Sequence, residues 1–76
     1  MASENLSSRE LPYSTEAEKA VLGGIMLKNE TWDIISDLVK EDDFHKEEHK
    51  LIYRTINNLQ DQGKPVDVIT VQEAIE

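Results

Sequence analysis

The chain has 76 residues, which is enough for one small domain but too few for a nucleotide-binding α/β fold or a barrel. It has no cysteine, so disulfides and cysteine-ligated zinc are excluded. Sixteen acidic residues oppose eight basic ones, and the net charge of −8 argues against direct DNA binding, which needs clustered lysine and arginine. An acidic surface suits solubility and basic protein partners. No apolar run approaches the ~20 residues of a membrane helix, so we expect a cytoplasmic protein without membrane contact.

Pro12 marks the first boundary in the chain. Residues 1–12 carry Ser, Glu and Asn with little apolar content, which predicts a flexible amino-terminal arm. Proline also disfavours helix at the residue before it. We therefore expect the helical domain to span residues 13–76.

The first predicted helix runs from about Glu16 to Leu27, because its apolar residues recur at helical spacing. Ser14 or Thr15 would be the N-cap, and Thr15 with Glu18 three positions later has the spacing of a capping box. The pair Gly23–Gly24 lies inside this helix, where each glycine costs about 1 kcal/mol relative to alanine. We expect close approach of another helix to compensate.

A second helix is predicted to start at Asn29, which is a favourable N-cap residue. Trp32, Ile35 and Leu38 follow with helical spacing, so we interpret Trp32 as a core anchor rather than a ligand-stacking residue. The polar connector that comes next holds one aromatic residue, Phe44, which we expect to insert into the core.

The third predicted helix spans about Lys46 to Gln62 and ends at Gly63, a favourable stop. Residues 66–69 are apolar and partly β-branched but have no partner strand, so we interpret them as an extended connector. Thr70 and Glu73 then have the spacing of a second capping box, which opens a fourth helix. The sequence stops barely one turn later, and we expect the natural domain to continue.

These elements predict an all-α fold, a small orthogonal bundle of three main helices plus a short fourth. The helix caps would be Thr15, Asn29 and Thr70. The predicted core consists of Val21, Leu22, Gly24, Ile25, Trp32, Ile35, Leu38, Phe44, Ile52, Ile56 and Leu59.

Two patterns in the sequence resemble metal-binding motifs, but neither has all the residues that a metal site needs. His45 and His49 match the H-x-x-E-H pattern of inverted zinc peptidases, but no third ligand is available downstream and the chain is too short for a substrate cleft. The acidic run at residues 41–43 lacks the alternating oxygen ligands and the glycine of a calcium loop. No nucleophile, base and orienting residue can be assembled. We therefore predict no catalytic residue, metal site or cofactor in this chain.

Two classes of small protein fit the length and the acidity of the chain. One is a stand-alone acidic helical adaptor. The other is an acyl carrier protein, which needs Asp-Ser-Leu at the start of its second helix to carry phosphopantetheine. This chain offers Ser36-Asp37-Leu38 instead, in the wrong order and inside a predicted helix.

Three segments of the chain, at residues 11–27, 42–53 and 63–71, have distinctive patterns. Together they resemble the amino-terminal domain of DnaB-type replicative helicases. Residues 11–27 (LPYSTEAEKAVLGGIML) resemble its opening helix, with a proline and a helix cap before Glu-Ala-Glu and an apolar-Leu-Gly run. Asp42-Asp43-Phe44, followed by His49 and Ile52-Tyr53, is similar to its Asp-Phe turn and third helix. Residues 63–71 (GKPVDVITV) are similar to its Gly-x-Pro-apolar-Asp segment. The resemblance covers about residues 11–76 in unbroken order.

The resemblance implies a parent protein that is a ring-shaped, ATP-driven hexameric helicase acting at the replication fork. Its amino-terminal domain would build a collar with other helicase subunits, help to bind primase and in some systems contact a helicase loader. ATP and magnesium would belong to the motor domain of the parent, because nothing here matches a phosphate loop. The family domain continues with more helix and a helical hairpin, so we expect apolar faces to be partly uncovered in this chain.

Overall fold

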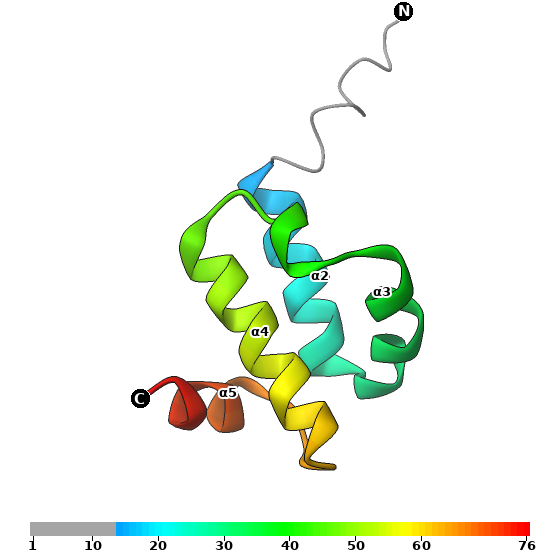
Figure 1. Cartoon of the computed structure of the whole chain (residues 1–76), viewed down its shortest axis with the longest axis vertical. Helices are drawn as coiled ribbons and strands as arrows, with labels where there is room; N and C mark the ends of the chain where they lie inside the picture. The colour runs from blue at the N-terminus through cyan, green and yellow to red at the C-terminus, as the bar shows by residue number, and fades with distance from the viewer. Residues whose placement is uncertain (1–13) are drawn as a thin grey trace, which may run out of the picture.

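The computed structural model describes residues 14–76, and these fold into four α-helices with no strand among them. The all-α prediction is confirmed. The predicted arm at residues 1–12 lies outside the described residues. Two short 3-10 helices, η2 and η3, flank the second α-helix (Figure 1). The elements are α2 (Thr15–Leu27), η2 (Asn29–Thr31), α3 (Trp32–Leu38), η3 (Glu41–Asp43), α4 (Glu47–Asp61) and α5 (Val68–Ile75).

Helices α2 and α4 form the centre of the fold and run side by side, with their amino-terminal ends at the same end of the molecule (Figure 1). Both are amphipathic, and Ile25 of α2 and Ile56 of α4 are completely buried. Helix α5 packs against α4, whereas α3 lies on the other side of the molecule (Figure 1). The fully buried apolar core consists of Leu22, Ile25, Phe44, Tyr53, Ile56, Leu59, Val66 and Val71.

Several predicted core residues lie at the edge of this core. The apolar residues that pack against it while partly exposed include Val21, Trp32, Ile35 and Ile52, and Gly24 is also partly exposed. Leu38 is different, because 72% of its surface is exposed and its placement in the core was wrong. Trp32, Ile35 and Val39 share the inward face of this segment at helical spacing, and Leu38 falls outside that face.

The N-cap of α2 is one of the two residues that the sequence offered for that position. Ser14 is the N-cap, and its side chain accepts a hydrogen bond from the backbone N–H of Ala17 at 3.3 Å. Thr15 is the first residue of the helix, so its prediction as a cap was wrong. The predicted capping box also fails, because the carboxylate of Glu18 contacts the loop before α4 instead of the helix start.

The start of the second helical segment also differs. Asn29 opens the 3-10 helix η2, and the residue at its N-cap position is Lys28. The predicted cap at Asn29 was wrong because its side chain makes hydrogen bonds to Ile25 and to the distant Val66. A tertiary contact therefore takes the place of the local one that the sequence suggested.

The turn between α4 and α5 follows the predicted stop. Gly63 has a φ of 71°, and the N–H groups of Gly63 and Lys64 donate to the carbonyls of Gln60 and Leu59. This is the double hydrogen-bond pattern of a Schellman motif, which favours glycine because of the positive φ.

Helix α5 begins earlier than predicted. Its N-cap is Asp67, which accepts from the N–H of Thr70, while the Thr70 hydroxyl accepts from the N–H of Asp67. Thr70 is therefore the third residue of the helix and not its cap. The extended connector predicted for residues 66–69 was wrong for Val68 and Ile69, because Asp67 begins the helix before them.

Candidate interaction site

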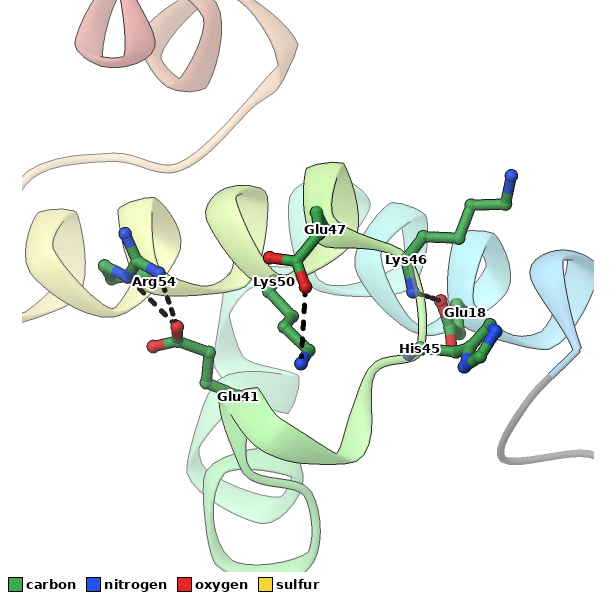
Figure 2. Close-up of polar contacts among 7 residues, drawn as sticks. All are labelled: Glu18, Glu41, His45, Lys46, Glu47, Lys50 and Arg54. Atoms are coloured by element: carbon green, nitrogen blue, oxygen red, sulfur yellow. Dashed lines mark hydrogen bonds and ion pairs between the residues drawn. The ribbon is translucent and has the colours of Figure 1, made fainter.

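Glu18 is a buried carboxylate that joins α2 to the loop before α4. Its side chain is on the core side of the helix, and only 4% of the residue is exposed. Oε2 accepts from the backbone N–H of His45 at 2.6 Å, and Oε1 accepts from that of Lys46 at 3.4 Å (Figure 2). Oε1 also lies 2.6 Å from Nδ1 of His49. We call these four residues the Glu18 cluster.

Glu18 and His49 continue the buried stripes of their helices. Glu18, Leu22 and Ile25 follow an i, i+4, i+7 spacing on α2, and His49, Tyr53 and Ile56 do the same on α4. This spacing was the signal in the sequence for a buried polar pair, and the capping-box interpretation of Glu18 obscured it.

The cluster keeps Glu18 charged despite its burial. Burial works to raise the pKa of Glu18, but the backbone N–H of His45, the ring of His49 and the N–H of Lys46 together outweigh it. The pKa of Glu18 is therefore lowered from its ordinary value. A buried carboxylate that is saturated with hydrogen bonds in this way stabilises a fold and is not poised as a general base at neutral pH.

The H-x-x-E-H pattern does not assemble a zinc site. His49 directs Nδ1 to Glu18 and is buried, whereas the side chain of His45 is exposed. Residues 14–76 contain no group of three or more histidine, aspartate or glutamate side chains placed to hold a metal ion.

An aromatic cluster holds η3 and α3 against α4. The Tyr53 ring lies 5.2 Å from that of Trp32 and 4.9 Å from that of Phe44, measured between centroids. The Tyr53 hydroxyl donates to the carbonyl of Val39. Burial, helped by the nearby carboxylate of Asp43, raises the pKa of Tyr53 and keeps this donor protonated. Tyr53, which is absent from the predicted core, therefore has a structural role.

Ion pairs on the surface of α4 are more exposed. Nε and Nη2 of Arg54 both donate to Oε2 of Glu41, at 3.1 and 2.6 Å (Figure 2). The Arg54 guanidinium lowers the pKa of Glu41. One helical turn away, Nζ of Lys50 lies 3.7 Å from Oε2 of Glu47. Part of the acidic surface is therefore paired with basic side chains of the same chain.

Asn29 connects the end of α2 to the segment before α5. Its Nδ2 donates to the carbonyl of Val66 at 2.7 Å and to that of Ile25 at 2.8 Å, while Oδ1 accepts from the N–H of Val66 at 2.9 Å. This side chain satisfies both backbone groups of buried Val66 and fixes the carboxyl end of α2 next to the start of α5.

An open apolar hollow of about 350 Å³ lies between the end of α2 and the start of α5. Leu27 is 90% exposed, and Val68 and Ile69 are both about two thirds exposed, so apolar surface here faces solvent. The residues that line this apolar hollow are Gly23, Met26, Leu27, Asp67, Val68 and Ile69.

The glycine pair of α2 does not mark a close helix contact. A Cβ on Gly23 or Gly24 would meet no atom within 4 Å among the described residues, apart from the neighbouring backbone of its own helix. The predicted helix approach was therefore wrong. Gly23 instead borders the apolar hollow, which the absence of a side chain leaves wider.

Nucleophilic residues in the described part of the chain have structural positions. Ser14 caps α2, and Ser36 lies inside α3, away from the helix start that an acyl carrier protein would need.

None of the helices at residues 14–76 is both long and apolar enough to cross a membrane. These residues thus form a small all-helical domain whose polar side chains connect helices to one another.

Comparison with known proteins identifies the family of this domain. Residues 10–76 match the DnaB-like helicase N terminal domain, so the chain belongs to that family. It is 49% identical over 67 residues to the replicative DNA helicase DnaB of Buchnera aphidicola subsp. Baizongia pistaciae. That alignment covers 88% of this chain and 14% of the relative.

Two further relatives extend the likeness across bacteria. The chain is 48% identical over 64 residues to the replicative DNA helicase DnaB of Haemophilus influenzae, covering 84% of this chain and 14% of that protein. It is 41% identical over 66 residues to the replicative DNA helicase DnaC of Bacillus subtilis, covering 87% of this chain and 14% of that protein. The chain therefore spans about one seventh of the length of these relatives.

Proposed function

We propose that this chain is the non-catalytic amino-terminal scaffold domain of a replicative DNA helicase. In this role it supports the assembly of a hexameric collar with other helicase subunits and contacts primase, and in some systems a loader, during DNA replication. The observation that carries the proposal is the match of residues 10–76 to the amino-terminal domain of DnaB-like helicases.

The physical features of the domain are consistent with a scaffold. Buried polar contacts at Glu18 and Asn29 fix the positions of helices, which is the requirement of a domain that presents surfaces to partners. The net charge of −8 makes direct DNA binding by this segment unfavourable. DNA unwinding, with its ATP and magnesium, would belong to the motor domain of the parent protein, which would act in the cytoplasm.

A domain exchange tests the proposal. Residues 10–76 of this chain replace the matching segment of the Haemophilus influenzae helicase, to which the chain is 48% identical. We expect the chimera to form hexamers by light scattering, to unwind forked DNA and to retain a primase that is captured by the parent helicase. A folded chimera that does not form hexamers would contradict the collar role. Hexamers that unwind DNA but fail to retain primase would limit the proposal to assembly.

The matched control carries Ile56→Asp in the same chimera. Ile56 is completely buried, so a charge there should unfold the exchanged domain. Loss of hexamers in this control together with their retention in the parent chimera would connect assembly to the folded domain. Equal hexamer formation by both proteins would show that the exchanged segment plays no part in assembly.

A further inference from the structure

We propose that the outer face of α3 binds a basic amphipathic helix of a partner protein. The proposal depends on the surface of α3 alone and does not require that the chain act in a helicase collar. This acidic–apolar face consists of four residues of α3 and one of the preceding η2, and all five are exposed: Asp33, Ile34, Asp37 and Leu38, with Glu30.

Helical spacing divides α3 into an inner and an outer half. Trp32 and Ile35 pack against the core together with Val39, which directly follows the helix. The opposite half presents Ile34 and Leu38, which are 63% and 72% exposed and lie one helical turn apart. Their side chains form a short aliphatic ridge, the shape that packs between the ridges of another helix.

Acidic side chains border this ridge along one side. Asp33 and Asp37 are one turn apart, each directly before one of the aliphatic residues, and Glu30 precedes Ile34 by four positions. No ion pair joins Glu30, Asp33 or Asp37 to any residue of the described chain, in contrast to Glu41 and Glu47 on the neighbouring surface. These three charges therefore remain available to a partner.

The two lysines at the ends of the acidic row, Lys28 and Lys40, form no ion pair with it within the described residues. Lys40 follows the helix and directs Nζ to the carbonyl of Ser36 at 2.6 Å, where it compensates the negative end of α3. Acidic residues beside an aliphatic ridge repel nucleic-acid phosphates and anionic lipid. They complement lysine and arginine beside the apolar stripe of a partner helix, which makes such a helix the occupant that the charges favour.

The test uses a defined probe, a peptide of about 14 residues made only of leucine and lysine with the leucines on one helical face. Binding to the chain is followed by Trp32 fluorescence, because Trp32 is the only tryptophan, and by amide NMR shifts that locate the contact. We expect shifts centred on α3 and an affinity that falls as salt increases. A peptide with glutamate in place of lysine should not bind.

Two double variants separate the components of this surface. Ile34→Ser with Leu38→Ser should weaken binding by about tenfold or more, because the aliphatic ridge is lost. Asp33→Asn with Asp37→Asn should weaken it several-fold and reduce its salt dependence. Leu27→Ser on α2 and the pair Asp61→Asn with Glu73→Gln are matched exposed controls and should leave affinity unchanged.

Specific outcomes would overturn the proposal. These are the absence of binding, equal binding of the glutamate peptide, shifts centred on the apolar hollow between α2 and α5, or equal weakening by the control variants. Thermal melts of all variants should coincide with that of the parent, because the substituted side chains are exposed. If the serine variant unfolds, the asparagine variant and the NMR map still decide the result.

Discussion

The α2–α4 pair and the flanking helices α3 and α5 are built from similar residues but use them differently. Between α2 and α4, isoleucines are completely buried and a carboxylate is enclosed in hydrogen bonds. On α3 and α5, by contrast, several aliphatic side chains are largely exposed, among them Ile34, Leu38, Val68 and Ile69. We infer that the buried residues between α2 and α4 contribute more stability than the exposed aliphatic residues of the flanks, which provide surface. This division between the centre and the flanks can be tested by substitution.

The largest expected effect is in the centre of the fold. Ile56→Ala removes completely buried methyl and methylene groups and should lower the free energy of unfolding by about 2–5 kcal/mol. That loss is comparable to the ~3–5 kcal/mol of net stability that such a small core supplies. The matched change on the flank is Ile34→Ala, which should alter stability by no more than about 0.5 kcal/mol. Urea unfolding measures both, and equal losses would contradict the division.

A smaller loss is expected at the polar contact between α2 and α4. Glu18→Gln keeps the shape of the side chain but removes the charge that accepts from His45, Lys46 and His49. Leaving such buried donors poorly satisfied should cost about 1–3 kcal/mol. Glu16→Gln is the control, because Glu16 is an exposed acidic residue of the same helix. Equal urea midpoints for the two variants would mean that the Glu18 cluster contributes little.

The same variant gives a pH test with a defined sign. Because the folded-state pKa of Glu18 lies below its ordinary value of 4.5, the folded protein binds this proton more weakly than the unfolded chain. The stability it contributes is therefore fully present above pH 4.5 and is lost as the pH falls through the folded-state pKa. The difference in stability between parent and Glu18→Gln should shrink on acidification. A difference that stays constant would exclude charge as the stabilising feature.

Gly24→Ala should act in the opposite direction. Gly24 lies inside α2 with helical backbone, and the position of a new Cβ is open among the described residues. Alanine should therefore stabilise the protein by about 0.5–1 kcal/mol. For a domain of this size, this corresponds to a rise of several degrees in melting temperature, at about 4–8 °C per kcal/mol. A lower melting temperature by circular dichroism would indicate that another surface needs the glycine.

Local signals in the sequence predicted the helices but not all of their ends. Apolar spacing placed the helical segments, and Gly63 predicted the turn that ends α4. The sequence offered Ser14 and Thr15 as caps of α2, and Thr15 was wrong because the adjacent Ser14 takes that position. The predicted cap at Asn29 was wrong because a distant backbone group binds its side chain. Such a contact depends on which helices meet in space. The partners of Glu18 and Asn29 lie 27 to 37 residues away in the sequence, so rules based on neighbouring residues do not predict these contacts.

The surface of the domain was less predictable than its core. Spacing alone suggested that Leu38 and Gly24 were buried, because a helical stripe does not show how wide the covered face is. The interpretation of the glycine pair as a close helix contact required a neighbouring helix, and none lies there among residues 14–76. Buried positions on a stripe can be inferred from sequence, but the limits of the stripe depend on the neighbours that the fold supplies.

The smallest effect is expected at the Glu41–Arg54 pair. Glu41→Gln removes one charge from a contact with a short Nη2–Oε2 distance of 2.6 Å, but both side chains are substantially exposed. Water and salt screen such a pair, and holding two long side chains in one geometry costs entropy. We therefore expect no measurable change in melting temperature at physiological salt. Arg54→Gln provides the complementary variant, and a double-mutant cycle isolates the coupling between the two residues. A coupling as large as the effect of Glu18→Gln would show that a surface ion pair stabilises this domain as strongly as a buried carboxylate does. The centre and the flanks would then differ in stability only because the centre buries more apolar surface.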